Sequence, residues 1–86
     1  MIVRVASPLR SYTNKASSVE AHGQSLEELL NNLDKSYPGI KFRMIDEQEK
    51  IREHIKLYVN EDEAHDLKVK LTDGDVVHII CALSGG

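Results

Sequence analysis

The sequence predicts an α+β fold in which a mixed β-sheet carries one main helix on one of its faces. Two patterns lead to this prediction. Segments near both ends of the chain alternate apolar and polar residues with the period of a strand, and one segment between them repeats its leucines with the period of a helix. Because 86 residues suffice for one domain and not for two, we expect a single domain over residues 1–86.

The helix has the clearest signals in the chain. Ser25 followed by Glu28 forms a capping box, in which the serine hydroxyl accepts a hydrogen bond from the first turn and the glutamate reaches back. The apolar residues of this segment lie on one stripe at helical spacing: Leu26, Leu29, Leu30, Leu33 and Tyr37. Pro38 and Gly39 end the helix, because proline cannot continue it and glycine adopts positive φ easily.

Strands are predicted on both sides of this helix. Residues 1–5 and 19–22 alternate and form a hairpin, with a polar loop between them at residues 10–18. We expect the acidic stretch at 61–70 to be irregular, and Asp73-Gly74-Asp75 to form a tight turn. Further strands or extended segments are expected after the helix, at residues 40–44, 55–60 and 76–81.

The last of these strands is predicted to have two different faces. Val77 and Ile79 form its inward pair, whereas His78 and Ile80 lie on the opposite face. A hairpin, one helix and a final strand that returns to the sheet form the β-grasp arrangement, and one helix covers only one face of such a sheet. We therefore expect His78 and Ile80, together with Leu83, to form an apolar docking patch on the other face.

Composition excludes several classes of function. Lys and Arg number 11 and Asp and Glu number 14, so the net charge of −3 lacks the basic footprint of a nucleic-acid binder and suits a partner with a basic patch. A chain of this size has little interior left for a substrate cavity, so no conventional active site is expected. The apolar start of the chain is too short for a signal peptide, because polar residues follow it at once. No apolar run reaches the roughly 20 residues that span a bilayer. We therefore expect no membrane partner and a cytoplasmic protein.

Few residues outside the terminus suggest chemistry of their own. The single cysteine, Cys81, excludes an internal disulfide and shares the strand face of Val77 and Ile79, so we expect it to pack. No metal site is expected from the scattered histidines, His22, His54, His65 and His78. Glu61-Asp62-Glu63 is interpreted as a solvated acidic turn. The sequence contains no phosphate-binding loop, nucleophile–base pair or dinucleotide fingerprint.

Four stretches together resemble a known family over essentially the whole chain. They are residues 3–10 with Tyr12-Thr13, then Tyr37-Pro38-Gly39, then Tyr58–Glu61, and finally the Asp73-Gly74-Asp75 turn followed by a hydrophobic strand and Ser84-Gly85-Gly86. In these stretches the chain resembles the MoaD/ThiS family of ubiquitin-like sulfur carrier proteins, and within it the CysO-type subgroup. The resemblance implies a ubiquitin-like β-grasp fold with a flexible C-terminal Gly-Gly tail at residues 82–86.

The resemblance also implies a chemistry for the tail. A ubiquitin-activating-type adenylating enzyme would use ATP to form an acyl-adenylate at the Gly86 carboxylate, and a sulfur donor protein would displace AMP and leave a thiocarboxylate. Ser84 and Gly85 would be required for activation, since residues with little or no side chain let the tail thread a narrow channel. The chain itself would catalyse nothing and bind no cofactor.

The partners implied by the resemblance lie in the synthesis of a sulfur-containing amino acid of the cysteine or homocysteine type, or of another thio-metabolite. A synthase that depends on pyridoxal phosphate would accept the sulfur, and a zinc metalloprotease would release the product. ATP, zinc and pyridoxal phosphate would thus be bound only by partner enzymes. Two alternatives share the tail chemistry: the small subunit of molybdopterin synthase, and a ubiquitin-like protein modifier conjugated through Gly86 to lysines.

Overall fold

The computed structural model describes residues 1–82, and its core is a mixed sheet of five strands in the order β2-β1-β5-β3-β4. β1 pairs with β5 in parallel, whereas the pairs β1–β2, β3–β5 and β3–β4 are antiparallel. This arrangement confirms the predicted ubiquitin-like β-grasp fold. The strand bounds are β1 (Ile2–Arg4), β2 (Ser18–Glu20), β3 (Ile55–Val59), β4 (Asp62–Ala64) and β5 (Val76–Cys81).

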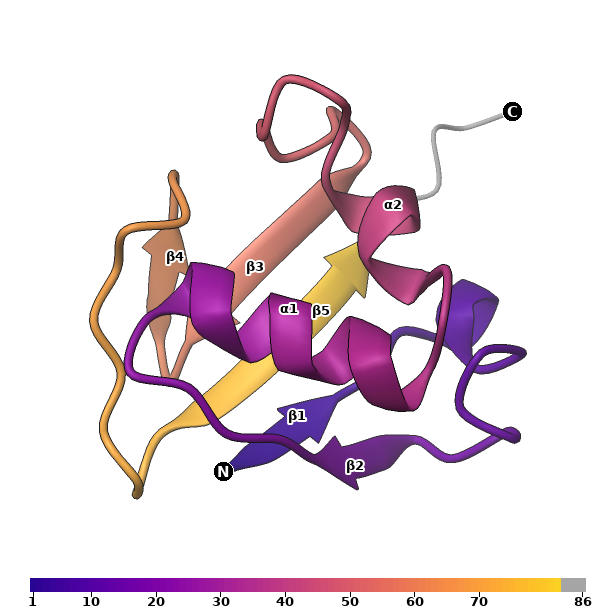
Figure 1. Ribbon diagram of the computed structural model, residues 1–86, viewed down its shortest axis with the longest axis horizontal. Helices are drawn as coiled ribbons and strands as arrows, with labels where there is room; N and C mark the ends of the chain where they lie inside the picture. The colour runs from indigo at the N-terminus through magenta and orange to yellow at the C-terminus, as the bar shows by residue number, and fades with distance from the viewer. Residues whose placement is uncertain (83–86) are drawn as a thin grey trace.

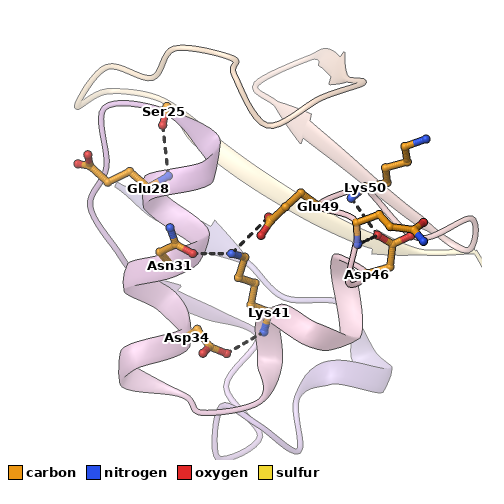
Figure 2. Close-up of polar contacts among 9 residues, drawn as sticks. Ser25, Glu28, Asn31, Asp34, Lys41, Asp46, Glu49 and Lys50 are labelled. Atoms are coloured by element: carbon orange, nitrogen blue, oxygen red, sulfur yellow. Dashed lines mark hydrogen bonds and ion pairs between the residues drawn. The ribbon is translucent and has the colours of Figure 1, made fainter.

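The predicted main helix is α1 (Leu26–Ser36), which lies across one face of the sheet (Figure 1). Ser25 Oγ accepts a hydrogen bond from the Glu28 N–H at 3.2 Å (Figure 2), and Glu28 reaches back to the N–H of Gln24 at 3.2 Å. Two further N–H groups of the first turn donate to carbonyl groups of Val69 and Leu67 in the loop before β5. The helix start therefore has partners for the groups that every helix N-terminus leaves free.

The core lies between α1 and the sheet. Each of the four leucines on the predicted stripe of α1 is fully buried. They belong to one cluster with inward residues of the strands, including Val3, Val77 and Ile79, and with Val5 just after β1. Tyr37, which caps the helix, is half-buried against the same cluster.

The prediction of a strand at residues 40–44 is wrong, because this segment forms the short helix α2 (Ile40–Met44). Gly39 starts it with φ of 97°, and Asp34 Oδ1 accepts hydrogen bonds from the N–H groups of Gly39 and Lys41, each at 3.1 Å. Ile40 and Met44 are buried whereas Phe42 is 55% exposed. A strand would place all three on one face, so the observed burial follows the i, i+4 spacing of a helix.

The side chain of Lys41 connects both helices to the turn that follows them (Figure 2). Its Nζ donates to Asn31 Oδ1 of α1 at 2.6 Å and lies 3.7 Å from Glu49 Oε2. The turn itself closes on Asp46 Oδ1, which accepts from the N–H groups of Gln48 and Lys50. These backbone donors, that of Lys50 first, lower the pKa of Asp46 below its usual value.

Part of the segment predicted to be irregular is also ordered differently. Residues 62–64 form β4, an edge strand paired with β3 through Leu57 and Ala64, so the expected acidic turn is largely a strand. Glu63 Oε2 lies 3.6 Å from Lys56 Nζ on β3. Near the start of the chain, a 3₁₀ helix η1 (Ser7–Leu9) follows β1 and buries Leu9 in the core.

The turn predicted at Asp73-Gly74-Asp75 is present and leads directly into β5. The Asp75 N–H donates to the Thr72 carbonyl at 3.0 Å, and Asp75 Oδ2 accepts from the Thr72 N–H at 2.9 Å. Asp75 Oδ1 accepts from Asn60 Nδ2, while Asn60 Oδ1 accepts from the N–H of Val76. These donors, the Thr72 N–H first, lower the pKa of Asp75. The carboxylate thus fixes the start of β5 to the end of β3.

Candidate functional site

The face of the sheet that points away from α1 carries the predicted docking residues. Along β5, Val77 and Ile79 are 0% and 3% exposed toward the helix, whereas Ile80 on the other face is 44% exposed and His78 is half-buried. The alternation of β5 places these side chains as the sequence indicates. Leu83, the third predicted docking residue, lies outside the described residues.

Strand register gives this outer face neighbours that sequence reasoning missed. His78 lies between Arg4 of β1 and Tyr58 of β3, and Ile80 lies opposite Lys56. In the next row Ile2, which is 46% exposed, is paired with Val76. The alternation of β1 indicates that Ile2 and Arg4 point outward, but no local pattern says that β1 lies beside β5. The outer face thus combines exposed aliphatic side chains with cationic ones.

A shallow groove of about 420 Å³ opens at the end of β1, beside the second half of β5. One wall comes from Val5 to Pro8 with Arg10 and Ser17, and the other from His78 to Cys81, while Arg4 lies at the end of β1. Arg10 Nε donates to the Val5 carbonyl at 3.0 Å, which holds that side chain along the wall. Among residues 1–82, the charged residues of the lining are arginines, and no carboxylate of that part of the chain lines it.

The only cysteine lies at the end of β5, next to the predicted tail. Cys81 is half-buried and packs against the core cluster, which confirms the packing expected from its strand face. Burial raises the pKa of its thiol. Because the thiolate is the reactive form of cysteine, this environment disfavours nucleophilic chemistry at Cys81.

The hydrogen bonding between this end of the chain and the β3 side continues one residue past the end of β5. The N–H of Ala82 donates to the His54 carbonyl at 2.7 Å, so this residue is still bonded toward the β3 side. Ser84, Gly85 and Gly86, which sequence reasoning predicts as the working part of the tail, lie outside the described residues.

The histidines do not come together within residues 1–82. His22, His54 and His65 are exposed at separate places, and His65 lies 4.0 Å from Glu63. Among those residues no three His, Cys, Asp or Glu side chains are grouped so that they could hold a metal ion. No helix in that part of the chain has the length and apolar character needed to cross a membrane.

Comparison with known proteins gives consistent matches over the whole chain. Residues 3–86 match the model of the ThiS family. The curated sulfur carrier protein CysO of Mycobacterium tuberculosis (strain CDC 1551 / Oshkosh) is 32% identical over 89 residues, which cover 98% of this chain and 96% of that protein. These matches confirm the resemblance found in the sequence.

Two crystal structures share both the fold and recognisable sequence identity. A chain of the Amycolatopsis orientalis BexX/CysO complex superposes with a TM-score of 0.91 and 33% identity, covering 99% of this chain and 98% of that one. Mycobacterium tuberculosis CysO, described as an antigen, gives a TM-score of 0.90 and 30% identity, with 95% and 98% coverage.

Proposed function

This chain belongs to the ThiS family, and from that premise we propose that it is a sulfur carrier protein whose cargo is bound at the Gly86 carboxylate. The observation that carries the proposal is the family match over residues 3–86, together with a sulfur carrier relative at 32% identity over nearly the full length of both chains. The fold supports it, because the described domain offers an outer face for a partner and holds β5, which leads toward the tail.

The proposed chemistry takes place in two steps on the tail. A carboxylate oxygen of Gly86 attacks the α-phosphorus of ATP, so pyrophosphate leaves and an acyl-adenylate forms. Sulfide (HS⁻) supplied by a donor protein then attacks the acyl carbon, the bond to AMP breaks with AMP as the leaving group, and a thiocarboxylate remains. Gly85 and Ser84 allow this approach, since a chain with small side chains reaches through a narrow channel to the ATP site.

In this proposal the chain contributes a docking surface and a reacting terminus, and its partners contribute catalysis and cofactors. Ile80 and His78, with Leu83, dock a ubiquitin-activating-type adenylating enzyme. The sulfur is then passed to a synthase that uses pyridoxal phosphate and assembles a sulfur-containing amino acid, which a zinc metalloprotease releases. We place these reactions in the cytoplasm. ATP, pyridoxal phosphate and zinc are bound by the partner enzymes.

Intact mass spectrometry tests the proposal. The full chain is incubated with the adenylating enzyme of its own organism, ATP and a sulfur donor. We expect a mass gain that corresponds to the replacement of one carboxylate oxygen by sulfur, and fragmentation should locate it at Gly86. Deleting Gly86 should abolish the gain, because the acyl carbon then stops one residue short, about 3.3–3.6 Å of extended chain, of the reacting geometry.

The deletion variant also provides its own control. Its melting temperature and its affinity for the enzyme should match those of the full chain, because the folded domain is unchanged. A whole added sulfur atom located at Cys81 would instead indicate a persulfide and contradict the proposal. Stable purification with a large molybdopterin-forming partner, or Gly-Gly remnants on lysines of other proteins, would favour the two alternative functions.

A further inference from the structure

The last strand of the sheet continues beyond the strand that pairs with it. β1 pairs with β5 from Val76 to His78, where the partner residue is Arg4, the last residue of β1. β5 runs on to Cys81, and on its other side β3 pairs with it to the end. Beyond Ile79, β5 therefore has a strand on one side only, at Ile80 and Cys81.

The hydrogen bonds on the β3 side show which backbone groups of β5 point toward the unpaired side. Val76 accepts from the Asn60 N–H, and Ala82 donates to the His54 carbonyl, both at 2.7 Å. Residues that bond to one antiparallel neighbour alternate with residues that do not, so the even-numbered residues of β5 bond to β3. The N–H and C=O of Cys81 consequently face the β1 side. Within residues 1–82 no backbone group bonds to them there.

The groove of about 420 Å³ lies on this unpaired side, and its charge differs from that of the whole protein. The chain carries a net charge of −3, yet Arg4 and Arg10 are the charged residues of the lining. Neither arginine forms an ion pair with a carboxylate in the described part of the chain. By contrast, the hollow beside α2 is lined by four carboxylates: Asp34, Asp46, Glu47 and Glu49.

We propose that this groove receives an extended, acidic segment of the adenylating enzyme, which adds to β5 as a strand beside Cys81 and places its carboxylates against Arg4 and Arg10. An unpaired strand edge binds extended peptides through main-chain hydrogen bonds, and neighbouring side chains supply the selectivity. Arg4 and Arg10, which form no ion pair within residues 1–82, supply charge complementarity to an acidic segment. A segment bound in the groove would hold the end of β5 in place, and β5 is the strand that leads toward the tail. The inference rests on the proposed function and specifies the partner's chemistry.

A matched pair of charge reversals tests the electrostatic part. Arg4→Glu changes an exposed residue at the groove, and Lys68→Glu makes the same change in net charge at an exposed residue away from it. We expect Arg4→Glu to raise the KM for the carrier in pyrophosphate release by about tenfold, with kcat little changed, whereas Lys68→Glu changes the KM by less than about twofold. Adding salt should reduce the difference between the two variants.

A second pair of variants tests strand addition. Cys81→Pro removes the N–H that faces the groove and leaves the bonds to β3 intact, since proline is tolerated where a strand N–H has no partner in the sheet. Cys81→Ser loses the same thiol but keeps the N–H. We expect the proline variant to raise the KM well beyond any change in the serine variant. In the wild-type protein, the Cys81 amide should also gain protection from hydrogen exchange when the enzyme binds, while the already bonded Ala82 amide gains little.

The outcomes separate this inference from the proposed function. Equal KM values for Arg4→Glu and Lys68→Glu, or an unprotected Cys81 amide in the complex, would overturn the groove proposal even if Gly86 gains sulfur. Protection of Cys81 by inorganic phosphate alone would also overturn it, because the groove would then be an anion site. If the wild-type protein never gains sulfur, the proposed function fails whatever the groove binds.

Discussion

The two faces of the sheet are built from alternate residues of the same strands, yet their surroundings differ completely. On the α1 side, Val3, Leu57 and Val77 are fully buried beneath the helix. On the outer side of the same sheet, Ile2 of β1 and Ile80 of β5 are 46% and 44% exposed. The first face accounts for the stability of the fold, whereas the second leaves aliphatic side chains at the surface, where we propose that a partner covers them.

The comparison shows how a small domain separates the residues that stabilise its fold from the residues that stay at its surface. A chain of this size needs nearly all its core, so a residue used for a partner must come from positions that the core does not need. Strand alternation supplies such positions at every second residue. Neighbouring residues of β5 should therefore differ strongly in their effect on stability.

The largest expected difference lies between Ile79 and Ile80. Ile79→Ala should lower the free energy of unfolding by about 2–5 kcal/mol, because it leaves a cavity beneath α1. Ile80→Ala should lower it by less than about 1 kcal/mol, as is usual for an exposed position. Urea denaturation of both variants measures the two values. Equal losses would show that the outer face is part of the stabilising core.

A charge at Ile80 tests the outer face for binding. Ile80→Asp should cost no more than about 1 kcal/mol of stability, the span of strand preferences, yet weaken binding to the adenylating enzyme by about tenfold or more. Calorimetry of the complex and a melting curve of the free protein give the two effects. The matched variant Phe42→Asp changes an exposed apolar residue on α2 and should leave the affinity unchanged. Unaltered binding in Ile80→Asp would place the docking surface elsewhere.

The smallest effect is expected at the end of the sheet, where Asp75 joins β3 to β5. Its pKa is lowered in the folded state by the Thr72 N–H and by Asn60, so its stabilising effect is complete above the unfolded value, about 3.9. The effect is lost as the pH falls from there through the folded pKa. Asp75→Asn should therefore be less stable at neutral pH and lose less on acidification. Denaturant titrations at neutral and acidic pH measure this, and parallel curves would contradict it.

The sequence predicts α1 and the faces of β5 well because their signals are local. Ser25 with Glu28 marks a helix start, and four leucines at helical spacing have one interpretation over so long a stretch. Ile40 to Met44 is different, since a five-residue segment with apolar residues at both ends and in its middle fits both periods. Its helix depends on Gly39 at positive φ and on Asp34, which caps it from a distance in sequence.

The candidate site was predictable only in the part that strand alternation controls. His78 and Ile80 lie on the outer face as expected, but their neighbours Arg4, Tyr58 and Lys56 depend on strand order and register. The sequence does not predict β4, because a three-residue segment that contains two acidic residues has little strand preference. Its pairing with β3 makes it a strand. The groove likewise depends on where the chain after β1 turns away into η1, whose Leu9 is buried in the core.

The central position of β5 between β1 and β3 has a consequence for how the protein is made. β1 and β2 form one hairpin and β3 and β4 another, and β5 alone joins them into a sheet. Contacts between segments so far apart in sequence form late, because the intervening chain must first be closed into a loop. On the ribosome the sheet cannot close until Cys81 has emerged, so the folded domain never exists without the strand that leads into its tail.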